Sequence, residues 1–337
     1  MTGYHFTTLN VISSYCLHPD MGAKNDTAVR VYEFIITGFD HLSHQKLLGS
    51  IILIAYVLIL FFCSINLSIV VADRRLHSPM YIFICNLAIV DIMFSTSSSI
   101  TMIAVVLAEM KTISYNSCIT SMFIYHLGDV TSCLAITLMA LDRMIAISLP
   151  LRYNSILTNT RCIMLIMAAW IIGIGSMVPN TVTVESIPYC QPVIRYVFCD
   201  YAAMIRAGCV DPVPYFQIPI IVFKWMWFLV GHFTLIFLTY VVIIFTVLRL
   251  KEKGSRKKMF STCISHIIVV STYFAPKLVS VLLTRIGVQL NLTERNALLI
   301  VASVVPPLIN SVTYCLTTKE LRTRLINMLT KHRVAIK

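Results

Sequence analysis

Residues 49–72 read GSIILIAYVLILFFCSINLSIVVA and carry no charged side chain anywhere in the run. A helix needs about 20 consecutive, mostly apolar residues to cross the hydrocarbon core of a bilayer, and this run is long enough. Its apolar residues are continuous, whereas strands of a membrane barrel alternate apolar and polar residues over about ten positions. The run therefore predicts a membrane-spanning helix, and it places the chain in a lipid bilayer.

Further segments of the same character follow this first span along the chain. Several are longer than a bilayer is thick, which indicates tilt or extension beyond the membrane. Together with the first they make seven predicted spans: 49–72, 81–108, 118–149, 162–184, 213–248, 259–284 and 297–316. The expected fold is an all-α membrane protein, a seven-transmembrane helix bundle.

The composition agrees with this fold and excludes several others. Apolar residues make up 58% of the 337 residues and charged residues 12%, against roughly 45–50% and about 25% in soluble globular proteins. A soluble fold cannot bury so much apolar surface, so much of it must face lipid. A soluble enzyme, a disordered chain and a coiled coil are all excluded.

The charge distribution predicts the orientation in the membrane. The chain has 27 Lys and Arg against 15 Asp and Glu, a formal net charge of +12. Most of the basic residues fall on one side, above all in residues 249–258 and after residue 316. Because cytoplasmic loops carry the excess of Lys and Arg, we expect the C-terminus in the cytoplasm and the N-terminus outside. The positive charge then faces the inner lipid headgroups, and nucleic-acid binding is not expected.

The spans divide the chain into three parts. Residues 1–48 are expected to form an extracellular N-terminal segment, in which 1–20 are an upstream extension if translation begins at Met21. Residues 49–316 form the seven-helix domain. Residues 317–337 form a cytoplasmic tail that starts as a short amphipathic helix, because leucines recur at four-residue spacing from Leu321.

The outer side carries two kinds of candidate modification. Cysteines expected there lie in an oxidising environment that permits disulfides, and four of them allow three pairings: Cys118, Cys190, Cys199 and Cys209. Their spacing does not fit a tetrahedral zinc site, so no metal site is predicted. Asn25-Asp26-Thr27 is a glycosylation sequon on the outer side.

Charged residues inside the spans are costly, and so they are candidates for function. Asp129 lies roughly 16 Å below Cys118 along the third span, at 1.5 Å per residue. Lys277 lies about 12 Å inward of Arg285 in the sixth span, and therefore at a similar depth. We expect Asp129 and Lys277 to pair across an outer cavity, or to hold a polar or zwitterionic ligand between them. The alternatives are a purely structural ion pair and a Lys277 that extends outward to the interface.

Asp91 lies in the middle of the second span. It can bind a cation or a water network, or hold neighbouring helices together, and the sequence does not choose between these roles. Catalytic motifs of hydrolases, metalloproteases and nucleotide-binding enzymes are absent. The spans show no internal repeat of the kind that transporters carry. We therefore predict a protein that is not an enzyme and has no catalytic residue and no cofactor.

Four stretches together resemble a known family. Residues 139–153 read MALDRMIAISLPLRY, which closely resembles the MAYDRYVAICxPLRY signature of odorant receptors, a family of rhodopsin-like G-protein-coupled receptors. Residues 79–91 (PMYIFICNLAIVD), 258–266 (KMFSTCISH) and 306–314 (PPLINSVTY) are similar to further signatures of that family. The resemblance extends from about residue 25 to about residue 325.

The resemblance implies specific pairings and roles. It implies a Cys118–Cys199 disulfide and a second disulfide, Cys190–Cys209. It also implies that Arg143 caps the cavity for the G protein, and that a set of polar residues forms the helix-packing and switch positions: Asp142, Asp91, Asn310 and Tyr314. The chain departs from the family pattern at Leu141, at Ser311 in place of a proline, and at Ser132, where many relatives have an acid.

The function expected from all these features is that of an odorant receptor of the plasma membrane. A small extracellular ligand would bind between helices three, five, six and seven and activate an olfactory-type heterotrimeric G protein that raises cyclic AMP. The expected ligand-binding residues are His126, Asp129, Phe274 and Lys277, and their charges favour a polar or zwitterionic odorant. The alternatives are a non-olfactory rhodopsin-like receptor and, further away, a channel or transporter.

Overall fold

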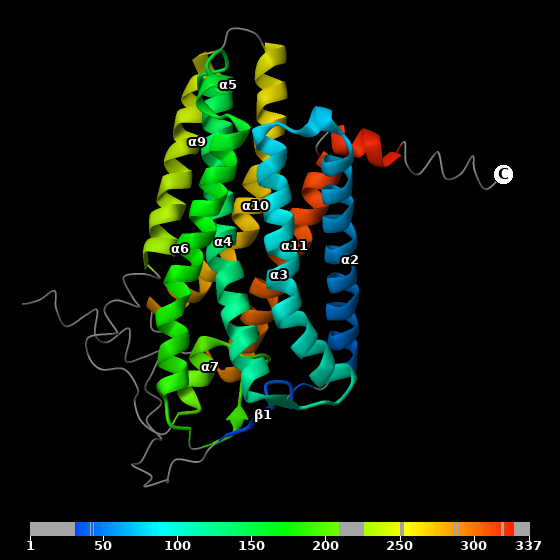
Figure 1. Cartoon of the computed structure of the whole chain (residues 1–337), viewed down its shortest axis with the longest axis vertical. Coiled ribbons are helices and arrows are strands. Elements are labelled where there is room, and N and C mark those ends of the chain that lie inside the picture. The colour runs from blue at the N-terminus through cyan, green and yellow to red at the C-terminus, as the bar shows by residue number, and fades with distance from the viewer. Residues whose placement is uncertain are drawn as a thin grey trace, which may run out of the picture.

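The computed structural model describes residues 31–40, 42, 44–189, 191–208, 226–249, 253–285, 288, 290–317 and 320–326. Seven helices in this part of the chain are long and apolar enough to cross a membrane, and they pack side by side in one bundle (Figure 1). Their bounds are α2 Gln45–Ala72, α3 Pro79–Leu107, α4 Tyr115–Ser148, α6 Asn159–Ser186, α9 His232–Arg249, α10 Lys253–Arg285 and α11 Leu292–Thr317. The predicted seven-helix bundle is confirmed.

The helices begin and end within a few residues of the predicted spans, with one difference in the fifth. That span was predicted to begin at residue 213, but residues 209–225 lie outside the described part of the chain. A π-helical turn, Trp227–Gly231, leads directly into α9. Turns of this kind are rare and often lie at functional positions in helices.

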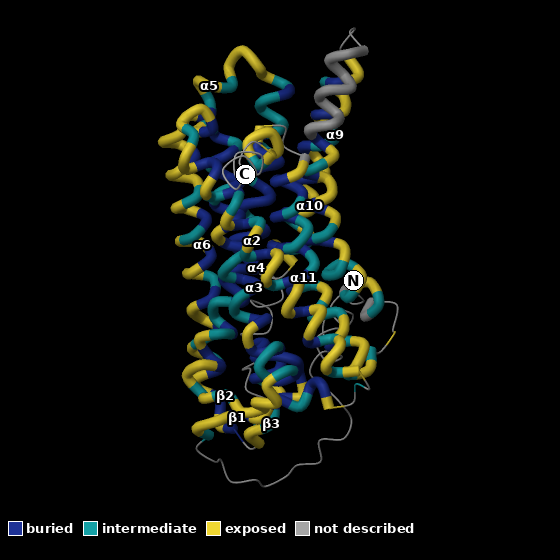
Figure 2. Tube along the Cα trace, turned by 90° about the vertical axis from the view of Figure 1, so that its right-hand side faces the viewer, coloured by how far each residue is buried: buried dark blue, intermediate teal, exposed yellow. Residues whose placement is uncertain are grey.

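α4 runs through the middle of the bundle, and it is the most buried of the seven candidate spans. α6 exposes most of its length, as the exposed residues along it in Figure 2 show. The apolar surface of α6 is what a bilayer would cover. Gly128 lets α3 approach α4 closely, since a Cβ there would lie 2.8 Å from the Cβ of Phe94. The residue after it, Asp129, is thereby held deep in the bundle, where it is 7% exposed.

One end of the bundle is called here the disulfide end, because Cys118 and Cys199 are bonded there. It carries a small sheet that the sequence did not predict (Figure 1). Its strand order is β2-β1-β3, with β1 Glu33–Ile36, β2 Thr112–Ser114 and β3 Val193–Ile194. β1 pairs antiparallel with β2 and parallel with β3. Strands of two to four residues are too short for a periodic pattern, and their partners lie far apart in the sequence.

Gly38 fixes how closely the segment after β1 packs against the loop after β3. A Cβ at residue 38 would lie 2.3 Å from the carbonyl carbon of Tyr196 and 2.6 Å from the nitrogen of Val197. These are backbone atoms that cannot rotate away, so any larger residue must push the two segments apart.

The opposite end, called here the Arg143 end, carries η1 Arg74–Leu76, α5 Tyr153–Ile156 and a short helix over residues 320–326. In Figure 1 the last of these lies beside the end of α2 and points away from the bundle. Leu321 is fully buried and Leu325 packs against the same apolar cluster, while Arg324 forms an ion pair with Asp73. The predicted amphipathic helix is therefore confirmed over these residues.

We predict that Gly38→Ala lowers the stability of the folded protein by about 1–3 kcal/mol, the usual cost of forcing extra volume into a packed site. Thermal unfolding of the purified protein in detergent measures the change. Gly175→Ala is the matched control, since an added Cβ there would have no described atom within 4 Å. Equal unfolding midpoints for the two variants would contradict the proposed close packing at Gly38.

Candidate functional site

Two charged side chains meet in the interior of the bundle, between α4 and α10. The ammonium of Lys277 forms an ion pair with Oδ1 of Asp129. The Tyr273 hydroxyl donates to the same Oδ1 at 3.1 Å and to the backbone carbonyl of Asp129 at 2.7 Å. The Lys277 ammonium also lies 3.3 Å from the centre of the Tyr273 ring. The expected contact between Asp129 and Lys277 is present, and Lys277 does not extend outward.

The sequence places these groups together by simple helical spacing. Tyr273 and Lys277 are four residues apart on α10 and therefore lie on one face. Asp129 faces them from α4, which is the pairing that its predicted depth implied. The pair is largely buried, with 10% of the Asp129 side chain and 20% of the Lys277 side chain exposed. Two ions so far from water are stable only because each is paired and further hydrogen-bonded or stacked.

Tyr273 also belongs to this site, and the sequence did not predict its role. Its position four residues before a charged residue in a span is the signal that could have found it. Cys133, one turn along α4 from Asp129, is also close to the site and donates from its thiol to the Phe228 carbonyl at 3.1 Å. That carbonyl belongs to the π-helical turn, so α4 contacts both α10 and the start of α9 here.

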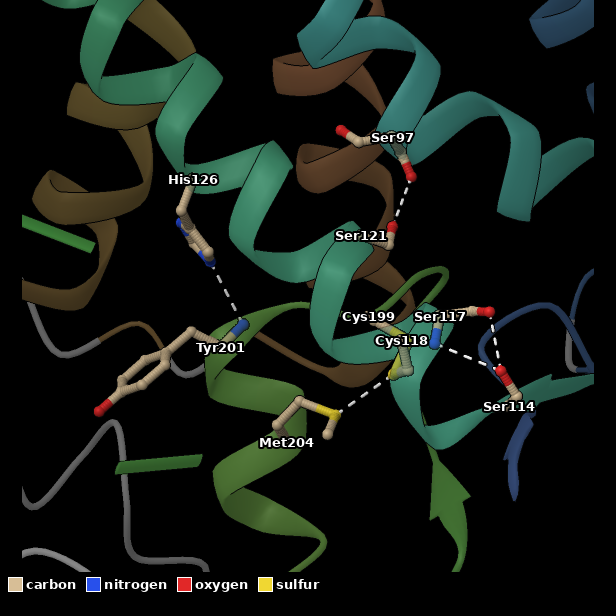
Figure 3. The surroundings of a disulfide bond; sticks show 9 residues. All are labelled: Ser97, Ser114, Ser117, Cys118, Ser121, His126, Cys199, Tyr201 and Met204. Atoms are coloured by element: carbon tan, nitrogen blue, oxygen red, sulfur yellow. Dashed lines mark hydrogen bonds between the residues drawn. A yellow bond between two sulfur atoms is a disulfide. The ribbon is translucent and has the colours of Figure 1, made fainter. Parts of the chain in front are cut away.

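His126 lies one turn from Asp129 toward the disulfide end and contacts the loop between α6 and α9, at the start of a short helix, rather than another membrane-spanning helix. Its Nε2 is 3.1 Å from Oδ1 of Asp200 and 3.3 Å from the backbone nitrogen of Tyr201 (Figure 3). Asp200 also caps α7 Tyr201–Arg206 by accepting from the Ala202 amide at 3.0 Å. Burial raises the pKa of Asp200, but His126 and the backbone amides lower it by more, so the pKa lies below its usual range. Asp200 is therefore a carboxylate at neutral pH.

A disulfide holds this loop against α4. Cys118 and Cys199 are bonded, as the resemblance implied, with their Cα atoms 5.5 Å apart. The Met204 sulfur lies 3.4 Å from the Cys118 sulfur and covers the bond (Figure 3). Since Asp200 directly follows Cys199, the disulfide also fixes the carboxylate that contacts His126. The second expected disulfide, Cys190–Cys209, and the sequon at Asn25 lie outside the described residues.

Phe274 is buried next to Tyr273, on the side of the site that faces α9. Its ring lies 5.4 Å from that of Phe233 on α9 and 4.9 Å from that of Tyr273. The structure thus brings Asp129 and Lys277 into contact, places His126 one turn closer to the disulfide end, and puts Phe274 at the boundary between α9 and α10.

The expected switch residues lie from the middle of the bundle to the Arg143 end. Arg143 contacts the carboxylate of Asp142 at 3.2 Å, and the Tyr153 hydroxyl donates to the same carboxylate at 2.6 Å. The Asn310 amide donates to Asp91 at 3.2 Å and so joins α11 to α3. The Tyr314 hydroxyl lies 3.8 Å from the sulfur of Met139.

Two further features concern α10 and α11, and the first of them was not foreseen. His266 of α10 is buried, with Nδ1 2.6 Å from the Tyr240 hydroxyl of α9 and Nε2 3.2 Å from the Ile136 carbonyl of α4. It joins three helices through one ring. Ser311 stands where the family has a proline, and α11 continues through it, with the hydroxyl of Ser311 bonded to the Leu308 carbonyl at 3.0 Å.

A seven-helix bundle with a disulfide from α4 to the loop after α6, and an Asp-Arg pair at the other end of α4, defines the class of seven-helix receptors. Within that class, residues 5–332 match the family model described as olfactory receptor. The chain belongs to the olfactory receptor family.

Individual relatives support this assignment. The chain is 33% identical to human olfactory receptor 10G4 over 306 residues, which cover 88% of this chain and 95% of the relative. It is 31% identical to human olfactory receptor 6N1, with 87% and 93% covered. It is 33% identical to mouse olfactory receptor 4E2, with 90% and 96% covered.

We predict that breaking the interior ion pair from one side costs more than removing it. Asp129→Asn or Lys277→Met alone leaves one buried charge without its partner, at about 3–5 kcal/mol. The double variant leaves neither charge and should be more stable than either single variant. Thermal unfolding of the purified unmodified receptor, the two single variants and the double variant measures these stabilities. A double variant that loses as much stability as the two single variants together would contradict the prediction.

Proposed function

We propose that this protein is an odorant receptor that binds a polar or zwitterionic small molecule at Asp129 and Lys277. Membership of the olfactory receptor family makes the chain a multi-pass plasma-membrane receptor that couples to a heterotrimeric G protein, and not an enzyme. The single observation that carries the ligand proposal is the ion pair between α4 and α10. An interior that holds two opposite charges favours a ligand that can interact with one or both of them.

The ligand site that we propose extends from Asp129 and Lys277 toward the disulfide end. His126 would line the side nearest the disulfide end, next to the loop that carries Asp200, and Phe274 would form the apolar side next to α9. A zwitterion fits this arrangement best, because it could contact both charges and leave neither without a partner. A hydrocarbon odorant would have to bind next to the intact ion pair.

The orientation is also a proposal. With the disulfide end outside, the Cys118–Cys199 bond faces an oxidising compartment, where disulfides persist. The exposed arginines of the other end, Arg74, Arg75 and Arg322, then face the cytoplasm, as basic residues do in short loops. In this orientation Asn25 is a glycosylation site and Cys190–Cys209 is a second extracellular disulfide.

The signalling mechanism that we propose is a shift between two populated conformations. A ligand shifts such an equilibrium only by binding one conformation more tightly than the other. α10 carries Tyr273 and Lys277 near the ligand and His266 two turns further toward the Arg143 end. Movement of α10 would therefore alter contacts at both sites.

The switch residues would respond to this movement. Arg143, held by Asp142 in this conformation, would become available to the G protein, while Asn310, Asp91 and Tyr314 adjust between α3, α4 and α11.

Arg143→Ala should abolish ligand-dependent cyclic AMP production in transfected cells, because it removes the side chain proposed to meet the G protein. The test uses a panel of odorants that includes amino acids and small amines, with the amount of receptor at the cell surface measured in parallel. Arg74→Ala, an exposed arginine at the same end, is the control and should signal normally. Ion or solute flux without any G-protein signal would contradict the proposed function.

A further inference from the structure

The two halves of the interior ion pair are held very differently. The Asp129 carboxylate sits on a short side chain and also accepts a hydrogen bond from the Tyr273 hydroxyl. The same hydroxyl donates to the backbone carbonyl of Asp129. The Lys277 ammonium sits on a flexible four-carbon stem. It is held by Asp129 and by the face of the Tyr273 ring, and its side chain is twice as exposed as that of Asp129.

This asymmetry decides which half a ligand can displace. If an amine bound Asp129 in place of Lys277, the displaced ammonium would remain close to a second cation. If a carboxylate bound Lys277 in place of Asp129, two carboxylates would likewise lie close together, but Asp129 would keep the hydrogen bond from the Tyr273 hydroxyl, whereas a displaced Lys277 would keep only the face of the Tyr273 ring. A neutral ligand offers neither charge, and a buried ion pair separated without replacement is strongly unfavourable.

We infer that Lys277 is the exchangeable half of the pair, and that a ligand carboxylate binds it while Tyr273 holds Asp129 in place. The recognised chemistry is therefore an organic acid rather than an amine. This inference rests on the proposed function. It specifies which group of the polar or zwitterionic ligand binds first, namely its carboxylate. Tyr273 is a positioning residue in this scheme, because it acts through Asp129.

The scheme makes opposite predictions for the two partners. Lys277→Met removes the cation that binds the acid, so the response to acids should be lost, and Lys277→Arg should retain it. Asp129→Asn keeps an acceptor for Tyr273 but removes the competing carboxylate. Asp129→Asn should therefore lower the acid concentration that gives half-maximal activation by about tenfold, which is the effect of one charge in a poorly solvated site.

Tyr273→Phe separates the positioning role from a general role in packing. It keeps the ring beneath Lys277 and removes only the hydroxyl that holds Asp129. Acids should become weaker activators of this variant, because Asp129 would lose its remaining hydrogen bond when Lys277 leaves. Any response to the matched neutral alcohol should be the same as in the unmodified receptor.

The experiment uses the full chain in cells that report cyclic AMP. The probes are pentanoate, heptanoate and phenylacetate, each tested beside the amine and the alcohol of the same carbon skeleton. Surface amount is measured for every variant, and the unfolding midpoint of the purified receptor with each probe gives a second readout of binding. Lys111→Met is the control, because it breaks the exposed ion pair with Asp40 at the disulfide end and leaves the interior intact.

The expected result is activation or thermal stabilisation by at least one acid, lost in Lys277→Met and strengthened in Asp129→Asn. Activation by amines alone would overturn the inference, and so would equal effects of both variants on all probes, since a purely structural pair predicts that. Failure of every acid in both readouts would overturn it as well. In that case the effect of Arg143→Ala on basal cyclic AMP tests the receptor function separately. If Arg143→Ala removes basal cyclic AMP, the receptor function still holds. If basal cyclic AMP is unchanged and no probe gives a G-protein signal, the receptor function itself is contradicted.

Discussion

The cost of keeping Asp129 and Lys277 charged away from water is the constraint on which the interior of this receptor depends. An unpaired ion inside a bundle is far more expensive than a lost apolar contact. α4 and α10 must therefore stay close enough for the carboxylate and the ammonium to meet, and the Tyr273 hydroxyl and ring complete their surroundings. Any ligand that enters between these helices has to replace what it displaces.

Neighbouring features of the fold preserve this geometry. Gly128 allows α3 to pack against α4 beside Asp129, and Cys133 bonds the π-helical turn that precedes α9. Toward the disulfide end, the Cys118–Cys199 bond and the His126–Asp200 contact hold the loop over α4. Toward the other end, His266 joins α10 to α4 and α9. In the mechanism that we propose, a change at Lys277 would reach the region of Arg143 through α10.

The sequence predicted those parts of the structure that follow from periodicity and depth. Apolar runs located the seven helices, and counting residues along two helices placed Asp129 and Lys277 at one level. The sheet at the disulfide end was missed, because its strands are short and pair across distant segments. Tyr273 and the His126–Asp200 contact were missed for a related reason. Which tyrosine turns inward, and where a loop folds back, depend on packing between elements and not on a local pattern.

Exchanging the two charges tests the central claim most directly. Asp129→Lys and Lys277→Asp each place two like charges side by side in the interior, and the double variant restores one of each sign. We predict that both single variants lose cell-surface receptor and cyclic AMP signalling, and that the double variant regains a substantial part of both. If each single variant and the exchanged pair all reach the surface and signal normally, the ion pair does not organise this receptor.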